Sequence, residues 1–218
     1  MRCISDASIE LDALKRRIAM SEAESMRMGI RDTSGISAHM KSACYVWLAA
    51  ILENAVRDYS NELRAAAILS GNPNDTLKAP LAQWVTRSEW SLAATQGREG
   101  WLKRAKFSVG DLPTQRLSDW PEYSSFADGK TVDAPLFDAI WLVLGLPGSS
   151  FSSPIERGAL NDICRRRNRV AHGEESAFVA GRQVTHQDLI RAVGHVDSLL
   201  TNWLIATDDW LSKAGWKS

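Results

Sequence analysis

The sequence predicts an all-α protein: an antiparallel bundle of helices with an irregular insertion between its core helices. Two stretches lead to this prediction. Residues 36–69 and 185–213 are long, carry apolar side chains at helical spacing, and are bounded by helix-capping or helix-breaking residues. No segment shows the apolar–polar alternation that is typical of a β-strand. We therefore expect a single helical domain over residues 1–218, with the insertion at about residues 72–135.

The N-terminal third is predicted to form two helices. Residues 8–28 place apolar side chains on one imperfect face and charged ones on the other. After a break that includes helix-capping residues, a longer helix covers residues 36–69, and its centre at residues 43–52 is apolar on all sides. Such a pattern indicates a helix that is buried on most sides. Glu53 follows directly, and an acidic group at the edge of the most buried helix needs a cationic or hydrogen-bonding partner.

In the insertion, apolar residues recur at helical spacing less clearly than in the long helices. Short helices are predicted at residues 77–87 and 99–106, and tryptophans alternate with glycines and prolines. We interpret these tryptophans chiefly as packing the insertion onto the bundle. The alternative is that some rings are exposed and stack on bases, because several basic residues lie close to Trp101. The tryptophans concerned are Trp84, Trp90, Trp101 and Trp120, and the basic residues are Lys103, Arg104 and Lys106.

The C-terminal half is predicted to contain three helices. A short one begins at Pro135 and ends at a Gly-Leu-Pro-Gly turn, and a second begins at Pro154 after a serine-rich loop. Residues 174–183 are expected to form a connection. Thr185 and Asp188 then form a predicted capping box at the start of the last helix, which continues to about residue 213.

The helix that begins at Pro154 ends in a basic run whose pattern is unusual. Four of the five residues 165–169 are arginine, and the apolar stripe of this helix has Arg167 in its middle. A guanidinium on an apolar face is costly unless it is paired or lines a cleft, so we expect Arg167 to turn inward toward Glu53. Asn168 and His172 lie one turn apart beside the stripe, and Gly173 is placed to end the helix. The stripe consists of Leu160, Ile163, Cys164, Val170 and Ala171.

Composition narrows the function classes. The 26 basic and 26 acidic residues give zero net charge, so any argument for nucleic acid or membrane binding must be local. No run approaches the roughly 20 apolar residues of a membrane span, and three scattered cysteines do not form a disulfide framework. These features indicate a cytoplasmic protein. The sequence has no glycine-rich phosphate loop, no common hydrolase motif and no metal-binding cluster, so we expect no metal and no cofactor.

The basic run resembles a known family motif. Arg167-Asn-Arg-Val-Ala-His172-Gly is similar to the R-x4–6-H motif of the HEPN superfamily, a group of all-helical ribonuclease and nucleotide-binding domains. The stretch from Leu48 to Val56, with Glu53, resembles the first core helix of RiboL-PSP-type HEPN proteins, and the Leu-Gly-Leu-Pro turn at residues 144–147 is also similar to that group. The resemblance covers about residues 36–70 and 135–205.

The resemblance implies a metal-independent endoribonuclease, a hydrolase in which the RNA 2′-hydroxyl attacks its own phosphate. In that role His172 is the acid or base, Arg167 holds the phosphate oxygens, and Asn168 orients His172 or the phosphate. Glu53 supports Arg167. The additional Arg165, Arg166 and Arg169 would bind RNA or simply form a solvated surface.

The resemblance also implies partners. HEPN-like proteins bring two motifs together across a two-fold homodimer interface, which gives a composite site with two histidines. Proteins of this kind often act as toxins of toxin–antitoxin pairs or as antiviral defence effectors that a regulatory protein restrains. Two other hypotheses stay open. One is a non-catalytic HEPN-like module that binds RNA, a nucleotide or a protein; the other is a helical scaffold in which Arg167 and Glu53 form a buried ion pair.

Overall fold

The structure, a computed structural model, describes residues 2–28, 36–86, 115–122, 125–127 and 131–218. Within these ranges the secondary structure is helical, and the only extended pairing consists of two isolated bridges, Thr76 with Arg116 and Leu77 with Lys217. The predicted all-α bundle is therefore confirmed. None of the helices in these ranges has the length and the apolar content that crossing a bilayer requires.

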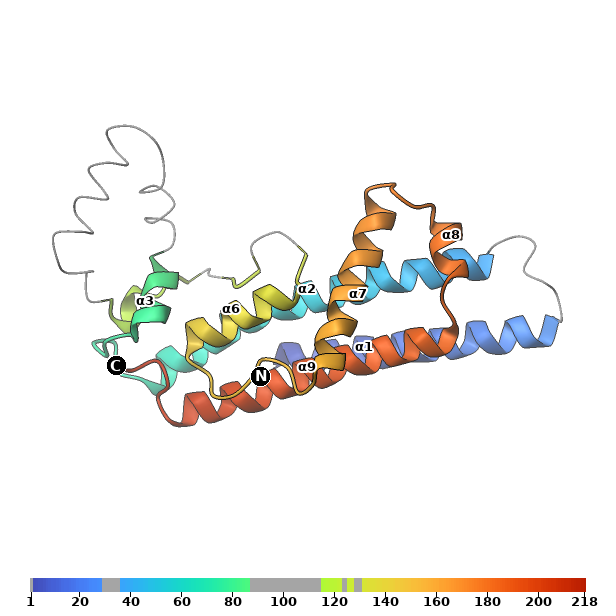
Figure 1. Cartoon of the computed structure of the whole chain (residues 1–218). Coiled ribbons are helices and arrows are strands. Elements are labelled where there is room, and N and C mark those ends of the chain that lie inside the picture. Colours follow the sequence, from blue (N-terminus) through green and yellow to red (C-terminus); the bar gives the residue numbers. More distant parts are fainter. Residues whose placement is uncertain (1, 29–35, 87–114, 123–124, 128–130) are drawn as a thin grey trace, which may run out of the picture.

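Three long helices form the body of the molecule: α1 (Arg2–Met28), α2 (Ile36–Ser70) and α9 (His186–Ser212). They lie side by side along most of their length (Figure 1). Apolar side chains from all three meet in one core, as the helical spacing of their apolar residues requires. The two helices that the sequence predicts most strongly, α2 and α9, begin and end within a residue or so of their expected bounds.

Helix α1 runs antiparallel to α2. Near the start of α1, the Cys3 backbone N–H donates a 3.1 Å hydrogen bond to Oε1 of Glu62, late in α2. Further along, the Arg17 guanidinium lies 5.9 Å from the ring centroid of Trp47, early in α2. Helix α1 therefore packs along α2 in the antiparallel direction.

Helices α2 and α9 run in the same direction. Lys41, early in α2, donates a 2.7 Å hydrogen bond from Nζ to the Val184 carbonyl just before α9. Later in both helices the hydroxyls of Tyr59 and Thr207 are hydrogen-bonded, and the Tyr59 ring contacts that of Trp203 with 4.4 Å between centroids. The shorter helices that follow in the C-terminal half pack against this parallel pair.

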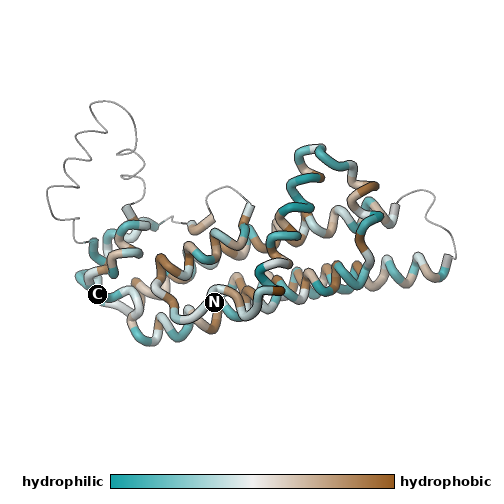
Figure 2. Tube along the Cα trace, viewed as in Figure 1, coloured by the Kyte–Doolittle hydropathy of each residue, from teal (hydrophilic) through white to brown (hydrophobic). Residues whose placement is uncertain are grey.

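The helices that pack against the pair of α2 and α9 are α6 (Ala134–Leu144), α7 (Pro154–Ala171) and the short α8 (Ala177–Arg182). A bidentate ion pair between Asp138 and Arg157, with a shortest distance of 2.7 Å, joins α6 to the start of α7. Helix α6 is apolar along most of its length, whereas α7 becomes hydrophilic toward its C-terminal end, where it rises away from the bundle (Figures 1 and 2).

The described parts of the insertion pack onto one end of the bundle. They include α3 (Ala79–Val85) and the 3-10 turn η1 (Leu117–Asp119). Trp120 is only 1% exposed and meets Trp84 edge to face, with ring centroids 6.1 Å apart. For these two tryptophans the packing interpretation is confirmed. Trp90, Trp101 and the helix predicted at residues 99–106 lie outside the described residues.

The short helix α8 was not predicted from the sequence. Residues 174–183 were expected to form a connection, yet Ser176 caps α8 by accepting a hydrogen bond from the Val179 N–H. Helix α8 has six residues, too few to show a period, and it contains a glycine. Gly181 is there because α8 packs closely on α2: a Cβ at this position would lie 1.7 Å from the carbonyl oxygen of Ala38.

Candidate functional site

Helix α7 has well-defined caps at both ends. Ser153 accepts a 3.2 Å hydrogen bond from the Glu156 N–H, and Pro154 occupies the first helical position, where a missing N–H costs nothing. At the other end His172 is the C-cap, and Gly173 has a φ of 71°, the left-handed conformation that favours glycine. The end of the helix predicted from Gly173 is therefore confirmed.

The apolar stripe of α7 is buried only in its first half. Leu160, Ile163 and Cys164 are buried in the bundle core. Beyond Cys164 the helix leaves the bundle, so Val170 is half-buried and Ala171 is exposed. The second half of the stripe thus faces the outside of this chain, and Arg167 lies on that part.

Arg167 is half-buried but does not pair with Glu53, contrary to the expectation from the sequence. Its Nη1 donates a 3.1 Å hydrogen bond to Oδ1 of Asn168, the next residue. Glu53 is half-buried on α2, and no ion pair joins it to Arg167, both residues being described. The neighbouring Arg166 packs over the ring of Tyr45, and Glu53 lies about 12 Å further along α2 at the usual helical rise.

Two expectations from the sequence depended on an ion pair between Arg167 and Glu53, and both fail without it. Glu53 does not act as a direct support for Arg167, because the guanidinium is held within α7. The hypothesis of a structural scaffold built on a buried Arg167–Glu53 ion pair also loses its premise.

Asn168 is the centre of the hydrogen bonds around Arg167. Its Oδ1 accepts from Arg167 and also from the Thr131 hydroxyl, at 3.0 Å. Because both donors bind the oxygen, the Nδ2 amide is turned the other way, and none of the described residues accepts a hydrogen bond from it. Thr131 is fixed in turn by its neighbour Val132, whose carbonyl accepts from the Cys164 thiol at 3.0 Å. Sequence reasoning missed Thr131, which no motif marks.

The four arginines differ in what neutralises them. Arg165 and Arg166 both bind the carboxylate of Asp162, Arg166 through Nε at 2.7 Å. Arg169 forms a 3.5 Å ion pair with Glu175. Arg167 is the exception: in the part of the chain that the structure describes, its hydrogen-bond partner is a neutral amide and no carboxylate pairs with it.

His172 is exposed at the end of α7, and its backbone N–H donates to the Asn168 carbonyl at 2.9 Å. Both residues are described, and no hydrogen bond or ring contact joins the His172 imidazole to Arg167. The structure thus places an oriented amide, an exposed imidazole and a guanidinium that pairs with no described carboxylate within two turns at one projecting helix end (Figure 1). Among the described residues there is no group of three or more metal-binding side chains.

A comparison of this chain with known protein families, with curated proteins and with solved structures finds no match.

Proposed function

We propose that this chain is a HEPN-type, metal-independent endoribonuclease whose site is the projecting end of α7. The observation that carries the proposal is the state of Arg167. A guanidinium that no carboxylate of the described residues neutralises, and that a neutral amide holds in place, is suited to the oxygens of a phosphodiester. A structural arginine at a half-buried position would instead be expected to have an anionic partner.

The chemistry needs three groups. A base removes the proton from the RNA 2′-hydroxyl, whose oxygen then bonds to the adjacent phosphorus. The P–O5′ bond breaks, and an acid gives its proton to the departing O5′ oxygen. The products are a 2′,3′-cyclic phosphate and a 5′-hydroxyl. Negative charge that gathers on the non-bridging oxygens is stabilised by a fixed cation, the role assigned to Arg167.

His172 supplies the proton-transfer group, because imidazole exchanges protons near neutral pH. Asn168 supplies a second hydrogen-bond donor, since its oxygen accepts from Thr131 and Arg167 while its nitrogen donates to none of the described residues. One imidazole does not serve readily as base and acid in the same turnover. We therefore propose that a second copy of the chain contributes its own His172, through a two-fold interface at the exposed second half of α7.

The test is cleavage of single-stranded RNA in EDTA, with the product ends identified. His172→Ala and Arg167→Gln are each expected to lower the rate by about 10²–10⁴-fold, the usual range for loss of one acid–base group or one stabilising cation. The matched controls are His39→Gln and Arg16→Gln, which remove an exposed histidine and an exposed arginine from other helices. Both controls are expected to cleave at the parental rate.

Four results would contradict the proposal or a part of it. Products with 3′-phosphate and 5′-hydroxyl ends that never pass through a cyclic phosphate would exclude the mechanism, and parental cleavage by His172→Ala would exclude the site. RNA that binds without being cut would identify a non-catalytic module. A monomeric mass in light scattering at the protein concentration of the assay would exclude the two-copy site.

A further inference from the structure

The projecting end of α7 buries few apolar side chains, so polar contacts decide how firmly the segment around His172 is held. Among the described residues, no hydrogen bond reaches the imidazole itself. The His172 backbone N–H donates to the Asn168 carbonyl at 2.9 Å, and the chain then turns at Gly173. The contacts that follow this turn therefore fix the segment from its other side.

Glu175 makes the contacts after the turn. Its side chain is only 9% exposed, whereas the preceding Glu174 is exposed. Oε2 of Glu175 lies 3.5 Å from Nη2 of Arg169, and Oε1 accepts a 2.8 Å hydrogen bond from Nε2 of Gln183. The Glu175 backbone N–H also donates to the Arg169 carbonyl, at 3.1 Å. Both carboxylate oxygens thus have partners, one on α7 and the other at the C-terminal end of α8.

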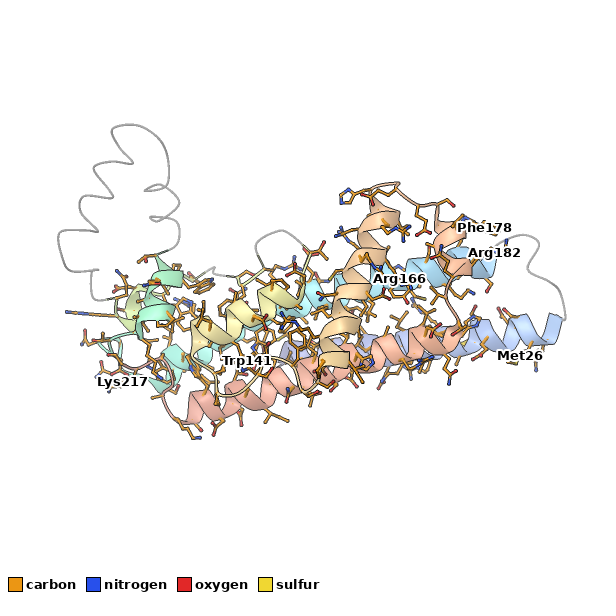
Figure 3. The ribbon with its side chains drawn as sticks, viewed as in Figure 1. Met26, Trp141, Arg166, Phe178, Arg182 and Lys217 are labelled. Atoms are coloured by element: carbon orange, nitrogen blue, oxygen red, sulfur yellow. The ribbon has the colours of Figure 1, made fainter. Side chains whose placement is uncertain are left out.

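Helix α8, in turn, is held by α2. Figure 3 labels Phe178 and Arg182 on α8, which lies against the early part of α2. Gly181 gives α8 its close approach to the α2 backbone. Directly after α8, the Val184 carbonyl accepts the 2.7 Å hydrogen bond from Lys41 of α2. Glu175 therefore connects the end of α7 to an element that packs firmly on the bundle.

The burial of this carboxylate makes the connection specific. A carboxylate that loses most of its water is costly unless donors replace that water, and here a guanidinium and an amide replace it. Because the two donors come from α7 and from the end of α8, both bonds persist only while the end of α7 keeps its place beside α8. Arg169 and Glu175 also close the segment between them, and His172 lies in the middle of that segment.

We propose that Glu175 is a positioning residue of the site. Its carboxylate holds residues 169–175 against α8 and thereby fixes where the His172 imidazole lies relative to Arg167 and Asn168. The proposal rests on the proposed function, because it assigns Glu175 a part in the same reaction. An acid or base acts only within hydrogen-bonding reach of the proton it transfers, and a misplacement of about 1 Å lowers a rate by up to about a hundredfold.

The test compares Glu175→Ala with Glu174→Ala in the cleavage of single-stranded RNA. Glu174 is the matched control, because it is the neighbouring carboxylate, is exposed, and pairs with none of the described residues. We expect Glu175→Ala to lower kcat by about ten- to a hundredfold without raising KM, since the variant misplaces His172 but leaves the arginines in place to bind RNA. Glu174→Ala should keep the parental kcat. Thermal unfolding shows whether each variant is folded at the temperature of the assay.

A second pair of variants tests the same connection from the side of α8. Gln183→Ala removes the donor to Oε1 of Glu175 and changes no charge, so kcat should fall severalfold. Gln183→Lys supplies an ammonium donor at the same position and should restore most of the rate. A side chain that served only to pack would not be replaced by a lysine, so this rescue separates positioning from packing. Failure of Gln183→Lys to restore the rate would contradict the proposal.

Amide hydrogen exchange, followed by NMR, gives a readout that does not require cleavage. In Glu175→Ala the His172 N–H should exchange about tenfold faster, because the segment opens more often, whereas the N–H of the buried Ile163 should exchange at the parental rate. Unchanged exchange at His172, or a folded Glu175→Ala that cleaves like Glu174→Ala, would overturn the proposal. If the parent protein cuts no RNA, the proposed function is wrong, and exchange at His172 still decides whether Glu175 holds this segment.

Discussion

The two halves of α7 have nearly opposite properties although they form one continuous helix. The first half is capped by Ser153, bears the buried Leu160 and Ile163, and is joined to α6 by the Asp138–Arg157 ion pair. The second half carries four arginines on turns that leave the bundle, and its apolar stripe is half-buried or exposed.

Under the proposed function, the first half of α7 serves stability and the second half serves chemistry. Burial of apolar area stabilises the first half, at roughly 25 cal/mol per Å², and thereby holds the second half in position. The second half contributes less buried apolar area, and its arginines form hydrogen bonds and ion pairs at the surface. Substitutions in the two halves should therefore affect different measurements.

The largest expected change comes from the first half. Leu160→Ala should lower the free energy of unfolding by about 3 kcal/mol, because a 2% exposed leucine leaves a cavity in the core. Denaturant unfolding followed by circular dichroism measures this. Ile155→Ala on the same helix, at a side chain 71% exposed, should cost less than about 0.5 kcal/mol. Equal losses in the two variants would mean that α7 does not pack on the bundle through this face.

The next expected change concerns the second half. Thr131→Val keeps the shape of the side chain but removes the hydroxyl that binds Oδ1 of Asn168. We expect about a tenfold lower cleavage rate, or about 1.4 kcal/mol, with little change in unfolding. Thr131→Ser should restore the rate because it restores the hydroxyl. A second readout does not require activity: the side-chain amide signals of Asn168 in NMR should shift in the valine variant and return in the serine variant. Unmoved signals would show that Thr131 does not orient this amide.

A smaller effect is expected at the start of the helix. Ser153→Ala removes the N-cap acceptor of the Glu156 N–H and should cost about 1 kcal/mol of stability. Ser153→Asp, which keeps an acceptor at that position, should recover most of it. Thermal unfolding measures both variants. If folded Ser153→Ala cleaves RNA at the parental rate, the stability of the first half and the activity of the second half are independent. A selective loss of cleavage would contradict that independence.

The smallest expected effect is at Asp162, between the two halves. Burial opposes ionisation of this carboxyl, but hydrogen bonds from Arg166 and Arg165 outweigh it and hold the pKa of Asp162 below its ordinary value. A lowered pKa in the folded state stabilises the protein above the unfolded-state pKa, about 3.9, and that stabilisation is lost as pH falls through the folded-state pKa.

Asp162→Asn should therefore be less stable than the parent at pH 7 by less than about 1 kcal/mol, since these ion pairs are partly exposed. The difference should shrink below about pH 4. Unfolding curves of both proteins from pH 7 to pH 2.5 measure it. A difference that stays constant with pH would mean that the asparagine acts through packing and not through the lost charge.

Sequence reasoning worked well where a segment carries its own period or cap. The bounds of α2 and α9, the capping box of Thr185 and Asp188, and the end of α7 at Gly173 all follow from local signals. It failed for α8, because six residues carry no period and the reason for Gly181 is a contact with α2. The relative direction of α2 and α9 could not be predicted either, since no local signal makes these two helices parallel.

The candidate site shows the same division. The residues Arg167, Asn168 and His172 stood out by type and spacing, because an arginine on an apolar stripe is locally unusual. Their partners could not be predicted. The expected partner of Arg167 was Glu53, yet the guanidinium binds Asn168, and Thr131 reaches that amide from 37 residues away in the sequence.

The sequence by itself determined which segments form the long helices, where most of these end, and which helix end carries an unusual concentration of arginine beside a histidine. Only the tertiary structure decided that α7 leaves the bundle after Cys164 and that Asp162 and Glu175 neutralise three of the four arginines. The physical reason is range: helix periods and caps act within a few residues, whereas the charge state of a site depends on which side chains the fold brings within hydrogen-bonding distance.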